Sequence, residues 1–128
     1  MLEARLIIGG EAVSARGDAI FERRDPVTDV VATRAAAASV EDAIRAANAA
    51  AAAFPYWSTV SPEERSRILI KAADVLRSRL PDFVEAMAEE IGASEVWANF
   101  NCQLAENILR DAAERTNMSM ETEVPSAH

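Results

Sequence analysis

The chain holds one cysteine, Cys102, and one histidine, His128. A reactive cysteine needs a base, a cation or a helix N-terminus that stabilises its thiolate. Cys102 lies more than one turn inside a predicted helix, and His128 is the last residue. One cysteine and one histidine also cannot complete a zinc site. We therefore interpret Cys102 as a packing residue and expect no catalytic residue and no transition-metal site in this chain.

Two further groups of residues could do chemistry, and both have simpler explanations. The pair Gly9-Gly10 has no third glycine and no helix after it, so it predicts a tight turn and not a phosphate-binding loop. Four carboxylates, at Asp82, Glu85, Glu89 and Glu90, form one acidic helical edge. Such an edge is far more often a solvated face than a catalytic carboxylate pair. We therefore expect no cofactor-binding residues here.

An aromatic and aliphatic stripe is the most distinctive pattern of the last predicted helix. Its members recur at steps of three and four residues, which places them on one face: Trp97, Phe100 or Asn101, Leu104, Ile108 and Ala112. Cys102 lies away from the centre of this stripe. Periodicity alone favours ordinary core for the stripe, and a ligand-binding wall is the alternative.

Strong local signals predict where the helices begin and end. Ser39 and Ser61 are each followed three residues later by an acidic residue, as in a capping box, and Ser94 opens the last helix. We expect the first helix to stop before Pro55, Pro81 to start a new helix, and Gly92 to end it. These signals predict a helical segment over residues 38–117 and an extended or disordered tail over residues 118–128.

Turn residues divide the first 37 residues into short extended segments. Gly9-Gly10 between two apolar runs predicts a hairpin, and further turns are predicted at Gly17-Asp18 and Asp25-Pro26. We expect two or three short antiparallel strands over residues 1–37. The chain by itself should thus be mostly α-helical, with a small N-terminal β-hairpin or strand pair.

Composition limits the possible partners. The formal net charge is −8, whereas nucleic-acid binding needs clustered Lys and Arg, so neither a nucleic acid nor an anionic membrane is an expected partner. The N-terminus lacks the features of a signal peptide, and no stretch is apolar over the length of a membrane span. A single cysteine suits a reducing compartment, and we expect a cytoplasmic protein.

Taken in order, the segments resemble the N-terminal part of the aldehyde dehydrogenase superfamily. "LIIGGEAV" is similar to its opening hairpin, and "FERRDPVTDVVATRAAAASVEDAIRAANAAAAAFPYWSTVSPEERSRILIKAADVLRSRLPDFVEAMAEEIG" follows its strands and first helices. "ASEVWANFNCQLAENILRDAA" is most similar to the branch that acts on aromatic aldehydes such as salicylaldehyde and vanillin. The usual Asn-Pro and Thr-Gly pairs are replaced here by Asp25-Pro26 and Thr28-Asp29.

The resemblance implies an α/β enzyme that oxidises an aldehyde through a cysteine thiohemiacetal and passes hydride to NAD or NADP. Members of the family are several times longer than this chain. Their catalytic cysteine, glutamate and asparagine and their cofactor-binding glycines lie downstream of the matched region. The resemblance therefore implies that residues 38–117 pack on a cofactor-binding domain, and that this chain alone is inactive and binds no cofactor.

Two sets of binding residues are implied by the resemblance. The helix that matches residues 94–115 borders the substrate entrance tunnel in the family, which places Trp97, Phe100 and Leu104 on the tunnel wall. Some members also hold a monovalent cation near the opening strands. Glu90 and the backbone carbonyls around Arg24 match that place, although a surface carboxylate is the simpler interpretation of Glu90.

Two hypotheses follow for the role of the chain. In the first, it is the N-terminal part of an NAD(P)-dependent dehydrogenase for aromatic aldehydes. Its apolar helix faces would then be covered by the rest of the enzyme or by self-association. In the second, it is a stand-alone, non-catalytic helical module for binding or oligomerisation, with the same ancestry.

Overall fold

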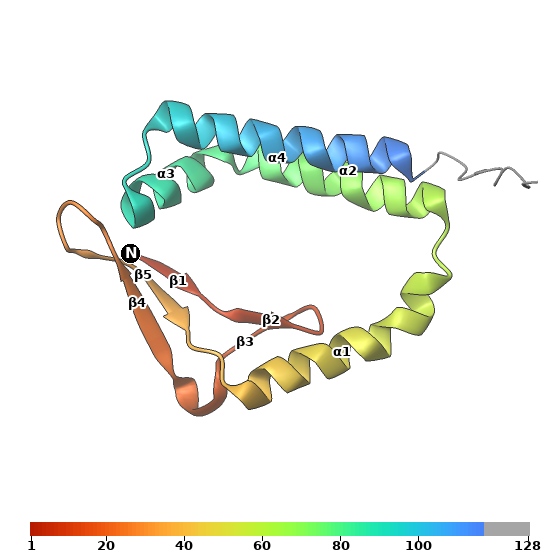
Figure 1. Cartoon of the computed structure of the whole chain (residues 1–128), viewed down its shortest axis with the longest axis horizontal. Coiled ribbons are helices and arrows are strands. Elements are labelled where there is room, and N and C mark those ends of the chain that lie inside the picture. Colours follow the sequence, from red (N-terminus) through yellow and green to blue (C-terminus); the bar gives the residue numbers. More distant parts are fainter. Residues whose placement is uncertain (117–128) are drawn as a thin grey trace, which may run out of the picture.

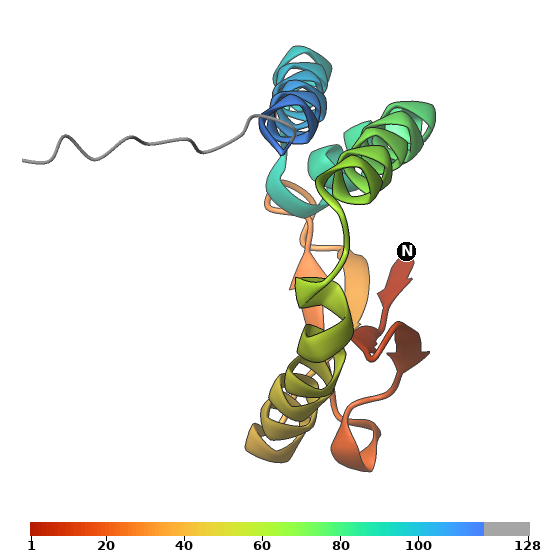
Figure 2. The same ribbon diagram turned by 90° about the vertical axis from the view of Figure 1, so that its right-hand side faces the viewer.

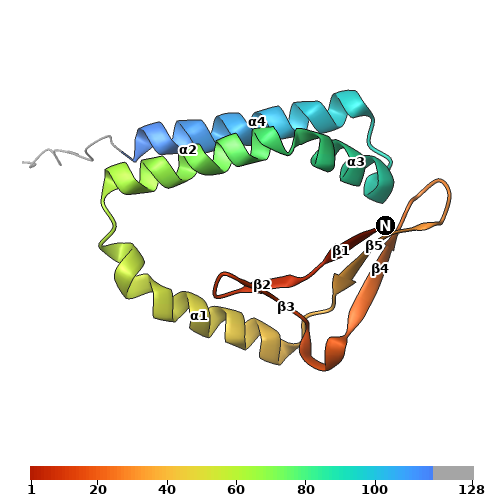
Figure 3. The same ribbon diagram turned by 180° about the vertical axis from the view of Figure 1, so that it is seen from behind.

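The computed structural model describes residues 1–116, and the tail predicted for residues 118–128 lies outside them. Four α-helices hold most of the described residues, as expected: α1 (Val40–Ser58), α2 (Pro62–Ser78), α3 (Leu80–Ile91) and α4 (Glu95–Arg115). In Figure 1, α2 and α4 run antiparallel and side by side, and α3 connects them at one end. α1 lies apart from this pair, along the opposite side of the molecule (Figure 3).

The N-terminal region forms two small sheets, built from five strands: β1 (Leu2–Ala4), β2 (Leu6–Ile8), β3 (Glu11–Val13), β4 (Ile20–Arg24) and β5 (Val31–Ala36). β2 and β3 form the predicted antiparallel hairpin, and Gly9 and Gly10 in its turn have φ values of 63° and 85°. The other sheet has the order β1-β5-β4. β4 and β5 are antiparallel, but β1 is parallel to β5, with Leu2 opposite Thr33.

The expectation of two or three antiparallel strands was therefore wrong in number, and wrong in direction for β1; β2–β3 and β4–β5 are antiparallel as expected. β1 has only three residues, all exposed, and its partner strand begins almost thirty residues later. A pairing over that distance leaves no trace in the local pattern of either segment. The predicted turns did form: Asp25 accepts hydrogen bonds from the N–H groups of Val27 and Thr28 at 2.7 and 2.9 Å. Asp29 takes a left-handed φ of 59°, the region in which the resemblance led us to expect glycine.

The helix caps are those that the sequence predicted, with one difference. Ser39 and Asp42 form a complete capping box, Ser94 accepts from the N–H of Trp97 at 3.3 Å, and Gly92 ends α3 with a φ of 65°. Ser61 likewise accepts from the N–H of Glu64 at 3.2 Å. The Glu64 carboxylate, however, accepts two hydrogen bonds from Arg67.

α1 continues through Pro55 to Ser58, so the prediction that it stops before this proline was wrong. Three carbonyl groups at its end are satisfied from the next helix. Arg65 of α2 donates from Nη2 to the carbonyls of Trp57 and Ser58, at 3.0 and 3.4 Å, and from Nε to that of Val60 at 3.2 Å. The Arg65 guanidinium also lies 5.3 Å from the centre of the Trp57 ring. This contact from outside the helix supports the additional turn.

The core of the described residues consists of small side chains. Its buried apolar members are Ala15, Ala32, Ala73, Ala98, Cys102 and Ala113, and no large side chain of residues 1–116 is fully buried. Many large apolar side chains are instead exposed on the helices, among them Phe54, Tyr56 and Val96. α2 and α4 therefore approach each other closely, while the helices leave wide apolar faces without a partner among residues 1–116.

Candidate functional site

α4 has two different faces, and the candidate site lies on the exposed one. Its buried residues are Ala98, Cys102, Glu106 and Ala113, at steps of four, four and seven, which follow one side of a helix. This side packs against α2, and the two helices are seen nearly end-on in Figure 2. The stripe lies on the other side: Trp97, Phe100, Leu104 and Ile108 are 55%, 54%, 45% and 57% exposed.

The two aromatic members of the stripe form a pair. The ring centres of Trp97 and Phe100 are 5.6 Å apart, with an angle of 26° between the rings, which is a stacked arrangement. The N–H of Trp97 is bonded to the N-cap Ser94, and its carbonyl accepts a hydrogen bond from the Asn101 side chain at 2.8 Å. A rigid first turn of α4 thus presents a flat aromatic surface, which continues into the aliphatic Leu104.

Cys102 lies on the buried face of α4 and is 8% exposed, in agreement with its interpretation as a packing residue. Its neighbours Asn99 and Glu106 line a small pocket with Leu76 and Arg77 of α2. The described residues include no histidine, because His128 lies beyond them. No base is therefore placed on the thiol by residues 1–116.

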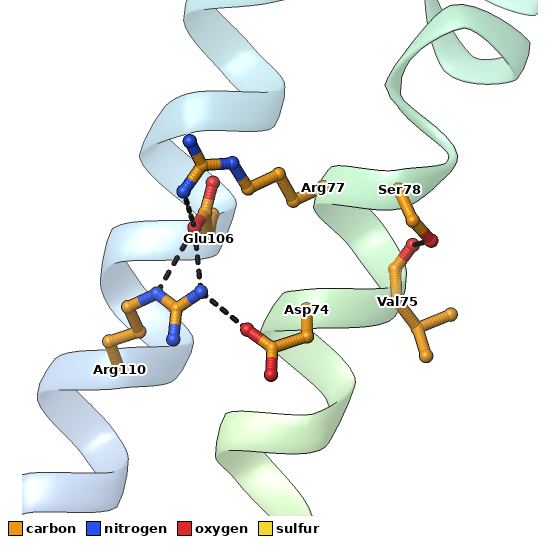
Figure 4. A network of polar contacts seen from close by, with 6 residues as sticks. All are labelled: Asp74, Val75, Arg77, Ser78, Glu106 and Arg110. Atoms are coloured by element: carbon orange, nitrogen blue, oxygen red, sulfur yellow. Dashed lines mark hydrogen bonds and ion pairs between the residues drawn. The ribbon is translucent and has the colours of Figure 1, made fainter.

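The two charged residues that line this pocket, Arg77 and Glu106, belong to a network that joins α4 to α2 (Figure 4). Arg110 donates to Asp74 at 2.7 Å and to the buried carboxylate of Glu106 at 2.8 Å. Arg77 approaches the same Glu106 oxygen at 3.7 Å. The carboxylates of Asp74 and then of Glu106 raise the pKa of Arg110, which stays a cation. These groups hold the two helices together.

Glu90, the predicted cation ligand, lies where α3 meets the three-stranded sheet. Its Oε1 accepts a hydrogen bond from the hydroxyl of Thr33 at 2.6 Å, and its Oε2 lies 3.4 Å from Nε of Arg23. The solvated-edge interpretation was thus correct for Asp82, which is 60% exposed, but not for Glu90, whose side chain is 25% exposed. Sequence reasoning missed Arg23, because no local signal connects it with a residue 67 positions later.

Four carboxyl groups have a pKa below their ordinary value: Asp25, Asp42, Glu63 and Glu64. Two of them, Asp42 and Asp25, have a structural role in connecting elements or closing a turn. The N–H groups of Arg16 and Ser39 lower the pKa of Asp42, which joins α1 to the short 3-10 helix Arg16–Asp18. The N–H groups of Thr28 and Val27 lower the pKa of Asp25 in the β4–β5 turn. Both shifts come from backbone donors that stabilise the charged form.

The predicted site residues thus fall in two places. Trp97, Phe100 and Leu104 lie together on α4, and Glu90 lies in the last turn of α3, before the short loop that leads to α4. Within residues 1–116, no three His, Cys, Asp or Glu side chains are grouped so as to hold a metal ion. The same residues include no helix with the length and hydropathy needed to cross a bilayer.

Known proteins resemble this chain over most of its length. The profile of the Aldehyde dehydrogenase family matches residues 13–128. A vanillin dehydrogenase of Pseudomonas fluorescens is 46% identical over 126 residues, which are 98% of this chain and 26% of that protein. A salicylaldehyde dehydrogenase of Pseudomonas sp. strain C18 is 45% identical over 112 residues, which are 88% of this chain and 23% of that protein.

Solved structures give the same result for the fold. The crystal structure of salicylaldehyde dehydrogenase from Pseudomonas putida G7, complexed with salicylaldehyde, superposes with a TM-score of 0.87 and 44% identity. The match covers 89% of this chain and 24% of that one. An NAD-dependent benzaldehyde dehydrogenase from Corynebacterium glutamicum matches with a TM-score of 0.81 and 32% identity, over 86% of this chain and 24% of its own. The chain spans about a quarter of the length of these relatives, and its sequence and fold show that it belongs to the aldehyde dehydrogenase family.

Proposed function

We propose that this chain is the N-terminal part of an NAD(P)-dependent dehydrogenase that oxidises aromatic aldehydes to carboxylic acids. Within it, Trp97, Phe100 and Leu104 form one wall of the tunnel through which the aldehyde enters. The observation that carries the proposal is the stacked Trp97–Phe100 pair, which is exposed on the side of α4 that faces away from α2. The names of the relatives, which refer to vanillin, salicylaldehyde and benzaldehyde, support an aryl substrate.

The physical role of the wall is to bind and orient a flat substrate. An aryl ring that stacks on an aromatic side chain, or meets it edge-on, gains about 0.5–1.5 kcal/mol beyond the burial of its area. A short aliphatic aldehyde gains no such term. The wall would thus favour aryl aldehydes and would hold the carbonyl group at a fixed depth in the tunnel. The chemical step itself belongs to residues outside this chain.

The remaining apolar faces support the same proposal. Phe54 and Tyr56 of α1 are 65% and 76% exposed, and each large apolar side chain left in water forfeits roughly 1.5–3 kcal/mol. In the proposal, the rest of the dehydrogenase or another copy of the chain covers these faces. A stand-alone binding module remains the alternative, and it would need to be stable and cooperative at 128 residues.

The first experiment is the intact mass of the protein made from the native gene in its own host. A mass about four times that of this chain is expected, since the chain spans 26% of a relative such as the vanillin dehydrogenase. A mass of 13.8 kDa would contradict the enzyme proposal and favour the stand-alone module.

The tunnel is then tested by Trp97→Ala in that whole protein, with purified enzyme and NAD or NADP. The KM for vanillin and salicylaldehyde should rise about 2- to 10-fold, which corresponds to the loss of one aromatic contact. The KM for propanal should change little, and Trp97→Phe should restore most of the loss.

Trp57→Ala provides the matched control. It removes the other tryptophan, which is 42% exposed on α1 and is engaged with Arg65. This variant should affect aryl and aliphatic aldehydes equally. Equal KM changes for both substrate classes in Trp97→Ala would contradict the tunnel assignment, while leaving the proposed reaction intact.

A further inference from the structure

The family resemblance implies a monovalent cation at the junction of α3 and the sheet, with Glu90 as its carboxylate ligand. Cations of this kind are held by several oxygen atoms, and each ligand must direct a free lone pair at the ion. The junction itself is well formed. A Cβ atom built on Gly92, just after α3, would lie 3.3 Å from Cγ of Pro26 in the β4–β5 turn. The fit of an ion therefore depends on what Glu90 already binds.

Both carboxylate oxygens of Glu90 have partners from the sheet. Thr33 is 3% exposed, and its hydroxyl donates to Oε1 at 2.6 Å, which fixes the orientation of the carboxylate. The guanidinium of Arg23 lies beside the other oxygen, with 3.4 Å between Nε and Oε2. Arg23 and Thr33 are directly opposite each other in the β4–β5 ladder, so their side chains share one face of the sheet. Glu90 reaches this pair from α3.

The guanidinium lies beside Oε2, so an ion bound to that oxygen would lie close to the Arg23 charge. A second positive charge there would be repelled by Arg23, and it would have to displace the side chain to reach the carboxylate. Arg24, the next residue, does not take part: its guanidinium is bound to the Glu22 carboxylate at 2.8 Å and to the carbonyl of Asp29 at 2.9 Å. The residues present therefore do not fit a monovalent cation as well as they fit an internal ion pair.

We propose that the guanidinium of Arg23 takes the place of the monovalent cation in this protein. The positive charge that joins β4 and β5 to α3 through Glu90 is then covalently part of the chain. Sodium or potassium binding at Glu90 is unnecessary, and removal of the Arg23 charge creates a site for it. This inference goes beyond the proposed reaction and does not depend on which aldehyde is oxidised.

The test measures sodium binding directly, by ²³Na line broadening, on the whole protein purified from its native gene in choline chloride. The wild type and Glu90→Gln should show the same broadening. Arg23→Met, which keeps most of the side-chain length without its charge, should gain a saturable increase. Arg23→Met/Glu90→Gln should lose that increase. As a second readout, the unfolding temperature of Arg23→Met should be lower in choline chloride and should recover in sodium chloride at equal ionic strength.

Two variants serve as controls. Arg24→Met removes an equal charge from the adjacent position without touching Glu90, and it should gain no sodium binding. Arg23→Lys keeps the charge and should behave as the wild type does. The proposal is overturned by saturable, Glu90-dependent sodium binding in the wild type. It is also overturned if folded Arg23→Met binds no sodium, or if Arg24→Met binds it equally. If Arg23→Met fails to fold, the sodium binding of the wild type and of Glu90→Gln still tests the proposal, because stronger saturable binding by the wild type would contradict it.

Discussion

The helices α1, α2 and α4 are of similar length, yet α1 is stabilised in a very different way from the α2–α4 pair. α2 and α4 meet along fully buried alanines, Ala73 and Ala98, and the Asp74–Arg110–Glu106 network joins them at the surface. α1 buries only Asp42. It contacts the β2–β3 hairpin and has a polar connection at each end: Asp42 binds the N–H of Arg16, and Arg65 binds the carbonyls of its last turn.

The difference shows which part of the fold is encoded within this chain. Close helix packing needs small residues at the contact, and α2 and α4 supply them to each other. Most of α1 has no such partner among the described residues: Ala47 is exposed, and so are Val40 and Ile44, at 73% and 56%. We therefore expect the α2–α4 pair to be stable within the chain, and α1 to gain most of its packing from a partner that the chain does not include.

The largest expected effect comes from filling the contact between α2 and α4. Ala73→Leu adds three carbon atoms where the side chain is 0% exposed, and such overpacking costs about 1–3 kcal/mol of unfolding free energy. The matched change on α1, Ala47→Leu, should stay within about 0.5 kcal/mol. Urea unfolding of the 128-residue chain, followed by circular dichroism, measures both. Similar losses for the two variants would contradict the proposed difference between the helices.

A smaller effect is expected from the charge network of the same pair. Glu106→Gln keeps the size of the side chain but removes the negative charge that Arg110 and Arg77 contact, at 2.8 and 3.7 Å. The loss in unfolding free energy should be about 1 kcal/mol, as for a typical intramolecular hydrogen bond, because the neutral amide oxygen can still accept from Arg110. Glu114→Gln, at an exposed position of the same helix, is the control and should be neutral in the same urea titration. A neutral Glu106→Gln would mean that the alanine contacts alone hold the pair.

The smallest effect concerns the polar connection of α1 and depends on pH. The folded-state pKa of Asp42 is lowered from 3.8 by the N–H groups of Arg16 and Ser39. A lowered pKa contributes stability above the unfolded value and loses it as the pH falls through the folded value. The wild type should therefore exceed Asp42→Asn in helix stability at neutral pH, and this advantage should shrink below about pH 4. Thermal unfolding of both proteins at several pH values measures this advantage. A stability difference that does not change with pH would contradict the lowered pKa of Asp42.

The helix boundaries could be predicted because their signals are local. Ser39, Ser61, Ser94 and Gly92 each act within four residues of their own position, and all four cap the predicted helices. The end of α1 could not be predicted. Its last turn depends on Arg65, which belongs to another helix, whereas the sequence around Pro55 indicates a break.

The candidate site, too, could be predicted from the sequence only in part. Helical periodicity places Trp97, Phe100 and Leu104 on one face and Cys102 on another, as the structure has them. It could not predict which of the two faces is covered, because that depends on the alanines of α2. The contact of Arg23 with Glu90 was beyond prediction for a similar reason, since it requires the sheet and α3 to be assembled first.

The parallel pairing of β1 with β5 has a consequence for the order in which the sheet opens. β4 and β5 are neighbours in sequence, so closing the loop between them costs little entropy, whereas β1 must wait for a strand that begins at Val31. The three residues of β1 are all exposed and form one edge of the sheet. Amide hydrogens of β1 therefore exchange with solvent far sooner than those of the central strand β5, and the first four residues detach while the β4–β5 ladder stays closed.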